Sequence, residues 1–104
     1  RNKNMNQQAM MRLKKMQKQM MDAQKQLEET VFTGTAGGGM VTVKVKGTHE
    51  VLSIEIDPDA LESKEDIEMI QDSIVAALND ANKKLESESQ KLLGGFGGGL
   101  GGLF

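Results

Sequence analysis

Val41-Thr42-Val43-Lys44-Val45-Lys46 alternates apolar and polar residues without a break. Because successive side chains of a strand point to opposite faces, this pattern predicts a half-buried strand with its valines toward a core. Residues 46–49 (Lys-Gly-Thr-His) read as a turn, and Leu52, Ile54 and Ile56 then alternate with polar residues to give a second amphipathic strand. Asp57-Pro58 ends that strand, since proline has no N–H to donate to a sheet.

Upstream, Val31-Phe32-Thr33 is β-branched and aromatic, which predicts a further strand. Glycines follow it at positions 34 and 37–39. A phosphate-binding loop requires Gly-Lys-Ser/Thr at the start of a helix, whereas Met40-Val41 starts a strand here. We therefore interpret the glycines as a tight turn or bulge between strands. The three segments predict a three-stranded antiparallel sheet.

Long helical patterns flank the sheet, over residues 5–29 and from about Ser63 to Leu93. Ser63 and Asp66 resemble a capping box at the start of the second helix. Gly94-Gly95 should end it, and residues 94–104 should form a flexible Gly-rich tail. We expect one α+β domain over residues 5–93, in the order α–β–β–β–α. Apolar stripes at three- and four-residue spacing mark both helices: Ala9, Leu13, Met16, Met20, Ala23 and Leu27, and Ile67, Ile70, Ile74, Ala77, Leu78, Ala81, Leu85 and Leu92.

Helix and strand lengths predict how the chain assembles. Helices of this size span about 37–43 Å at 1.5 Å per residue, whereas strands of about six residues reach about 20 Å. Both helices must therefore overhang the sheet and carry part of their apolar stripes with them. Pairing with a second copy would bury those stripes, so we expect a homodimer.

Charge is distributed unevenly along the sequence. Residues 1–27 carry seven Lys or Arg and one Asp, a net charge of +6, whereas residues 50–88 carry twelve Asp or Glu and three Lys, a net charge of −9. The chain begins at Arg1 rather than Met, so we expect residues before it. It has no Cys, no run of 18 apolar residues and no secretory signal pattern, which favours a cytoplasmic protein.

The basic residues of the first helix are the informative feature. At 100° per residue from Leu13, its four lysines lie between about 100° and 200°, opposite the apolar stripe at about 280–340°, with Arg12 at the flank. Lysines without aromatic residues for base stacking favour phosphate contacts, and Arg12 is suited to bidentate contact with guanine. DNA, RNA, a solvated face and a membrane surface remain open on spacing alone. The candidate DNA-binding residues are Arg12, Lys14, Lys15, Lys18 and Lys25.

Catalytic chemistry is not predicted. His49 is the single histidine, and without cysteine it builds no familiar metal or nucleophile site, so we interpret it as a solvated turn residue. Asp57, Asp59 and Glu62 are explained by capping and the helix dipole rather than by acid–base catalysis. The acidic side of the second helix is interpreted as a solvated face, or as a surface that repels DNA: Glu68, Asp72, Asp80 and Glu86.

The middle of the chain resembles the YbaB/EbfC nucleoid-associated proteins. The resemblance rests on residues 34–47 (GTAGGGMVTVKVKG), on residues 51–58 (VLSIEIDP), on Asn79-Asp80-Ala81 and on the Met/Gln/Lys-rich first helix. It implies a homodimer whose sheets join and whose long helices project as tweezer-like arms. It also implies duplex DNA as partner, a location at the nucleoid and a link to gene regulation. The basic residues of the first helix fit the family's DNA contacts.

Two hypotheses follow from these patterns. The first is a nucleoid-associated, homodimeric DNA-binding protein without a cofactor, metal, membrane or small-molecule substrate, and not an enzyme. The second is a helical protein-interaction module that docks a partner through its Met-rich stripe, because Met10, Met11 and Met21 lie off the main stripe.

Overall fold

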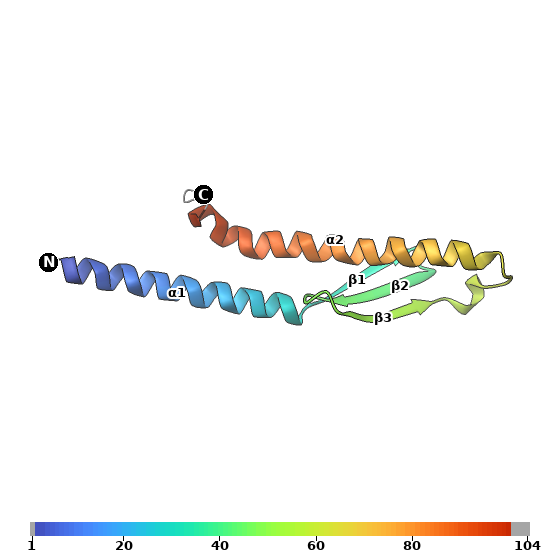
Figure 1. Cartoon of the computed structure of the whole chain (residues 1–104), viewed down its shortest axis with the longest axis horizontal. Coiled ribbons are helices and arrows are strands. Elements are labelled where there is room, and N and C mark those ends of the chain that lie inside the picture. The colour runs from blue at the N-terminus through green and yellow to red at the C-terminus, as the bar shows by residue number, and fades with distance from the viewer. Residues whose placement is uncertain (1, 101–104) are drawn as a thin grey trace.

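The computed structural model describes the backbone of residues 2–100 and the side chains of residues 6–94. The predicted α–β–β–β–α order is confirmed, with one short 3-10 helix added before the second long helix (Figure 1). The elements are α1 (Asn2–Glu29), β1 (Val31–Ala36), β2 (Val41–Lys46), β3 (Val51–Ile56), η1 (Pro58–Ala60) and α2 (Asp66–Leu100).

The sheet is antiparallel with the order β1-β2-β3, so consecutive strands are neighbours. Gly37, Gly38 and Gly39 connect β1 to β2 with φ angles of 65°, 69° and 92°, a left-handed conformation that glycine adopts without steric cost. The prediction of a tight glycine turn is confirmed. A register shift at Lys44/Val45 marks a bulge between β2 and β3.

The core lies between α2 and the inner face of the sheet, which is the face turned toward α2. The predicted inward valines Val41, Val43 and Val45 are fully buried. Gly34 in β1 permits the close packing of α2, because a Cβ at this position would overlap the α2 backbone at Ala77 and Ala81. The remaining core residues come from α1, β1 and α2: Leu27, Phe32, Ala77, Ala81 and Leu85.

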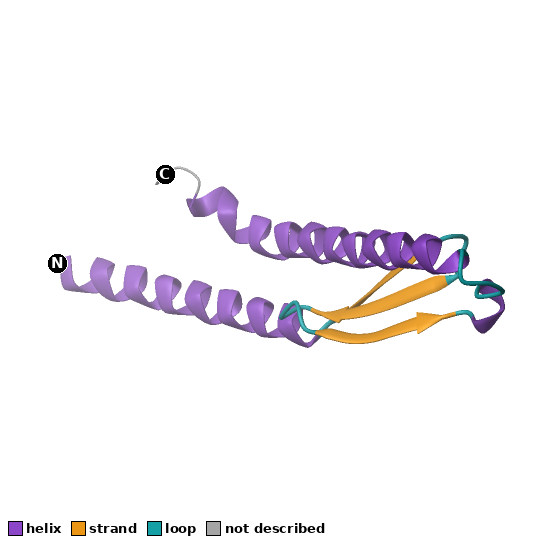
Figure 2. Cartoon of the chain, turned by 45° about the vertical axis from the view of Figure 1, so that its right-hand side comes forward, coloured by secondary structure: helices purple, strands orange, loops and turns teal. Residues whose placement is uncertain are grey.

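The third strand is less covered than the sequence suggests. α2 lies over β1 and β2, as Figure 2 also shows, and leaves β3 at the uncovered edge. Its apolar residues are therefore 41–48% exposed to solvent: Val51, Leu52, Ile54 and Ile56. The amphipathic pattern of β3 correctly predicts a strand, but within residues 6–94 its apolar side chains are only about half covered.

Asp80 and Lys84 of α2 close the opposite edge of the sheet, at β1. The Asp80 carboxylate accepts a hydrogen bond from Thr35 N at 3.1 Å, and Lys84 Nζ donates to the Thr33 carbonyl at 2.8 Å. The two side chains also form an ion pair at 3.4 Å. The Thr35 N–H, and secondarily Lys84, lower the pKa of Asp80. The interpretation of Asp80 as part of a merely solvated acidic face is therefore wrong, since it binds the β1 backbone.

The two long helices run antiparallel and project beyond the same end of the sheet (Figures 1 and 2). The chain is accordingly elongated, with extents of 78 × 23 × 15 Å. On α1, Leu27 is buried, while Met16, Met20 and Ala23 are half-buried on the side that faces α2. Within the single chain, α2 packs against α1, while Leu13, further along the stripe, stays 55% exposed. The expected cover by a second copy stays a prediction.

The start and end of α2 differ in how well the sequence predicts them. The Asp66 carboxylate accepts hydrogen bonds from Glu62 N at 2.9 Å and Ser63 N at 3.1 Å, which is one half of the predicted capping box. The expected end at about Leu93 is wrong, because α2 continues to Leu100. Glycine costs about 1 kcal/mol in a helix but does not block it sterically, so Gly94-Gly95 alone does not stop α2. Flexibility of the segment 94–104 stays a prediction.

Candidate nucleic-acid interface

The C-terminal end of α1 is fixed to the sheet. Leu27 is 4% exposed and lies against Gly47, where a Cβ would overlap the Leu27 carbonyl. Gly47 N donates to the Thr30 carbonyl at 2.9 Å, and the Thr30 hydroxyl donates to the Gln26 carbonyl at 2.6 Å. These contacts set the direction in which α1 leaves the sheet, and with it the position of every side chain on the helix.

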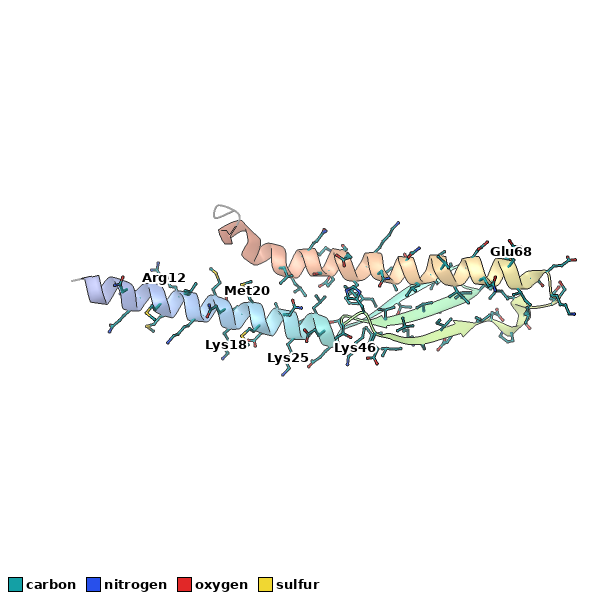
Figure 3. The ribbon with its side chains drawn as sticks, viewed as in Figure 1. Arg12, Lys18, Met20, Lys25, Lys46 and Glu68 are labelled. Atoms are coloured by element: carbon teal, nitrogen blue, oxygen red, sulfur yellow. The ribbon has the colours of Figure 1, made fainter. Side chains whose placement is uncertain are left out.

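All five sequence-predicted DNA-binding residues are exposed on α1. Lys18 and Lys25 extend from the side of α1 that faces away from α2, whereas Arg12 extends from another side (Figure 3). This arrangement follows from helical periodicity, because the half-buried stripe occupies the opposite side. Lys14 and Lys15 share the lysine side of the helix, so the structure brings the four lysines together and leaves Arg12 at their flank.

We call the surface formed by Lys14, Lys15, Lys18 and Lys25 the basic face of α1. From Lys14 to Lys25 it spans about 16 Å of helix at 1.5 Å per residue. Within residues 6–94 none of these lysines forms an ion pair, the one pair there being Lys84–Asp80. Asp22, Glu28 and Glu29 lie within four residues of Lys25, so the positive potential is strongest toward Lys14 and Lys15.

The other candidate residues have structural explanations. The Asp57 carboxylate caps η1 by accepting a hydrogen bond from Asp59 N at 3.0 Å, as capping predicts. His49 is exposed in the β2–β3 turn with a φ of 75°, which confirms its interpretation as a turn residue. In the described part of the chain there is no group of three side chains suited to a metal ion, nor a helix long and apolar enough to cross a membrane.

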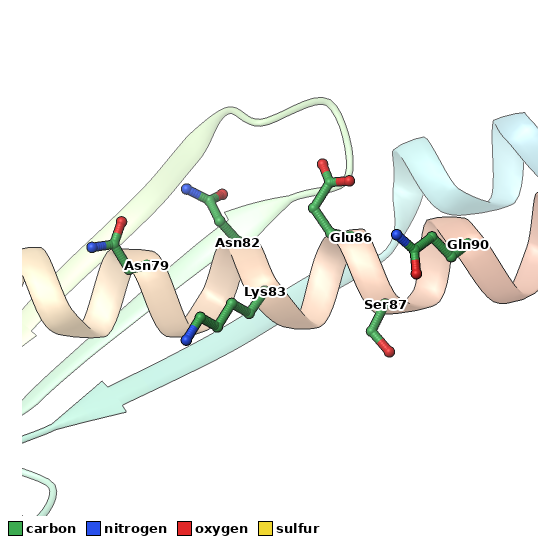
Figure 4. Close-up of a pocket in the computed structure, with 6 residues that line it drawn as sticks. All are labelled: Asn79, Asn82, Lys83, Glu86, Ser87 and Gln90. Atoms are coloured by element: carbon green, nitrogen blue, oxygen red, sulfur yellow. The ribbon is translucent and has the colours of Figure 1, made fainter.

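A shallow depression on α2 offers no catalytic arrangement. It is lined by side chains of this one helix, on the side opposite the sheet, so no second element encloses it (Figure 4). Its amide and hydroxyl groups point outward with Lys83 and Glu86 among them. A site for acid–base chemistry needs a pocket that separates two pKa values, and a single open helix face does not provide one. The lining residues are Asn79, Asn82, Lys83, Glu86, Ser87 and Gln90.

Lys44 and Lys46 are basic residues that the sequence-based assignment omitted. They alternate with the buried valines of β2, so they belong to the outer face of the sheet, with Lys44 exposed and Lys46 half-buried. The signal was present in the Val-Lys alternation, since the face opposite a buried one is turned to solvent. By contrast, Glu68, Asp72 and Glu86 are exposed on α2, so acidic side chains gather on the helix that lies on the other side of the sheet.

Residues 2–100 match the model of the YbaB/EbfC DNA-binding family. The chain belongs to this family. The match extends over nearly the whole sequence and agrees with the resemblance inferred from the glycine turn and the two following strands. The family is one of DNA-binding proteins rather than of enzymes.

Relatives of known name and structure agree with the assignment. A nucleoid-associated protein of Chloroflexus aurantiacus is 43% identical over 101 residues, which cover 96% of this chain and all of the relative. A nucleoid-associated protein of Legionella pneumophila is 45% identical over 83% of this chain and 75% of the relative. An uncharacterized Helicobacter pylori protein of known crystal structure has 32% identity and a TM-score of 0.65, over 81% of this chain and 87% of that one. This YbaB/EbfC member therefore resembles the two nucleoid-associated proteins in sequence and the Helicobacter pylori protein in fold.

Proposed function

We propose that this YbaB/EbfC protein is a nucleoid-associated, cytoplasmic protein that binds duplex DNA as a homodimer, mainly through the basic face of α1, and that it takes part in gene regulation. The observation that carries the proposal is a row of exposed lysines opposite the packing stripe of α1. Family membership supplies DNA as the partner. No step of this function requires a cofactor or a catalytic group.

The mechanism is electrostatic. Lysines that bind phosphates release the counterions condensed on DNA, which makes the affinity depend steeply on salt and little on sequence. Arg12 lies at the flank of the basic face, where a guanidinium suits bidentate contact with the edge of a guanine. Sequence preference, where present, is therefore assigned to Arg12 and general affinity to the lysines.

The proposed dimer joins two sheets through β3. The β1 edge is closed by Asp80 and Lys84, whereas no side chain of residues 6–94 bonds to the β3 backbone in this way. An edge strand with unpaired N–H and C=O groups is a template for another strand. The apolar side chains of β3 and the neighbouring Leu61 and Ile67, which are 52% and 46% exposed, would be buried by the second copy.

Exposed apolar residues of α1 support a second candidate function, a docking surface for a protein partner. Met10, Met11 and Met21 are 56%, 70% and 72% exposed beside the stripe that packs against α2. Flexible methionines suit such surfaces. This candidate predicts specific protein binding that survives high salt and does not need the lysines.

A binding measurement with a sizing measurement tests the proposal. Fluorescence anisotropy with a labelled 30-base-pair duplex of random sequence should show tight binding at 50 mM salt and much weaker binding at 200 mM. Light scattering should give about twice the chain mass of 11.3 kDa. Absence of duplex binding at 50 mM salt would overturn the DNA-binding function. A folded monomer would overturn the dimer alone.

A further inference from the structure

The outer face of the sheet, turned away from α2, is mostly polar and carries two lysines, with the exposed Val31 beside Lys46. β1 contributes Thr33 and Thr35, both exposed, and β2 contributes Lys44 and Lys46. These residues are neighbours across the strands, because Thr33 pairs with Lys44 and Thr35 with Thr42. Hydroxyl and ammonium groups on one surface are the donors that proteins use to bind phosphate oxygens.

This outer face lies on the same side of the molecule as the basic face of α1. The packing stripe of α1 and the buried valines of β2 both face α2, so the opposite surfaces of helix and sheet share one side. In Figure 3, Lys18, Lys25 and Lys46 extend along one side of the molecule, away from α2. The contacts of Leu27, Thr30 and Gly47 hold the helix and the sheet together where the two surfaces meet.

We propose that the outer face of the sheet is a second contact surface for the DNA backbone, continuous with the basic face of α1. The inference rests on the proposed DNA-binding function and extends it from the helix to the sheet. Lys44 and Lys46 bind phosphates, and the hydroxyls of Thr33 and Thr35 donate hydrogen bonds to phosphate oxygens. Pairing of two protomers through β3 would leave this face open on both.

The length of the combined surface fits a duplex. The helix from Lys14 to Glu29 spans about 22 Å and the strands about 20 Å, which gives roughly 42 Å. Base pairs rise about 3.4 Å along the duplex axis, so this length corresponds to about 12 base pairs. The basic face of α1 alone, at about 16 Å, would cover about five.

Acidic side chains lie on both sides of the molecule. Asp22 and Glu29 lie among the lysines of α1, at about 180° and 160° from Leu13, and reduce the positive charge there. Glu68, Asp72 and Glu86 are exposed on α2, across the sheet from Lys44 and Lys46, and they repel phosphates there. On the outer face Glu55 pairs with Thr42, two residues along β2 from Lys44. Glu55 therefore opposes DNA binding at this end of the surface, and replacing Glu55 with a neutral residue should strengthen DNA binding.

The test compares two double variants that each remove two positive charges per chain. Lys44→Gln/Lys46→Gln changes the outer face, and Lys64→Gln/Lys83→Gln, the control, changes exposed lysines just before and on α2. Each phosphate contact contributes about 0.9 to the slope of log affinity against log salt. The Lys44→Gln/Lys46→Gln variant should flatten this slope by up to about 1.8 for each protomer that contacts the DNA. At 0.1 M salt it should weaken binding by about 8-fold for one lost contact and about 60-fold for two.

The outcomes separate the inference from the function on which it rests. Weaker binding and a flatter slope for the Lys44/Lys46 variant, with the control near wild type and Glu55→Gln binding more tightly, would support the inference. If wild type binds DNA and both double variants behave alike, the outer face is only solvated and the inference fails, while the function of α1 stands. If wild type does not bind duplex DNA at 50 mM salt, the proposed function itself fails. Circular dichroism confirms that each variant is folded.

Discussion

Replacement of Lys14, Lys15, Lys18 and Lys25 by Glu should abolish most of the DNA affinity while preserving the fold. The four side chains are exposed and none forms an ion pair within residues 6–94. Glutamate has a helix propensity close to that of lysine, and the buried Leu27 and its stripe are unchanged. The helix should therefore remain folded against α2 with the sign of one face reversed.

The expected magnitude follows from the number of lysines. Four lysines of α1 in each of two protomers, at about 0.9 per phosphate, contribute about −7 to the slope of log affinity against log salt when all of them reach DNA. With partial contact we expect the α1 lysines to contribute between about −3 and −7, and Lys44 and Lys46 would add to this. Between 50 and 200 mM salt, affinity should then fall by about 60-fold to about 16,000-fold.

Anisotropy titrations at four or more salt concentrations measure this slope. The Glu variant should show no saturable binding at 50 mM salt, and circular dichroism and a sizing column should show an unchanged fold and assembly. A control variant places Glu at three other lysines, Lys64, Lys83 and Lys91, which are exposed and lie outside α1. If the α1 variant binds as tightly as wild type, the basic face of α1 is not the DNA surface, and the assignment of these residues is wrong even though the family is right.

Further predictions concern assembly and stability. Ile54→Lys should convert the dimer into a folded monomer, because Ile54 is 48% exposed in one chain and would place a charge in the proposed interface; an unchanged mass in light scattering would refute the β3 dimer. Gly34→Val should destabilise by about 3 kcal/mol or more, since its Cβ overlaps the α2 backbone, whereas Gly38→Ala, in open space with a φ of 69°, should cost about 1–2 kcal/mol; equal effects in thermal melts would contradict this packing. A chain ending at Leu93 should melt within a few degrees of the parent, and a larger drop would show that the Gly-rich segment packs on the domain. Asp80→Asn should lower the melting temperature at pH 7. Because the pKa of folded Asp80 lies below its ordinary value of 3.8, this stabilisation is present above that pH and is lost as pH falls through the folded pKa, so the two melting temperatures should converge in strong acid.

The local elements could be read from the sequence because they depend on short-range patterns. Alternation at residues 41–46 identified a strand and its buried valines, and helical periodicity placed the lysines of α1 opposite Leu27. The glycine turn at residues 37–39 was predicted because a strand rather than a helix follows the glycines, and their positive φ angles agree with it. The order of elements and the family followed from these signals together. Strand and helix periodicity reflect bond geometry, so they hold without knowledge of the tertiary structure.

The contacts between elements required the tertiary structure. Nothing near Asp80 in the sequence shows that its carboxylate binds Thr35, 45 residues away. Nor does the pattern of β3 show that α2 leaves it uncovered, or that Lys46 continues the surface of α1. The apolar stripe of α1 was readable, but its partner was not, because an apolar stripe is equally well buried by α2 of the same chain or by a second copy. Hydrophobic burial is non-directional, so the sequence specifies which residues avoid water, and only the packing of helices on the sheet decides what covers them.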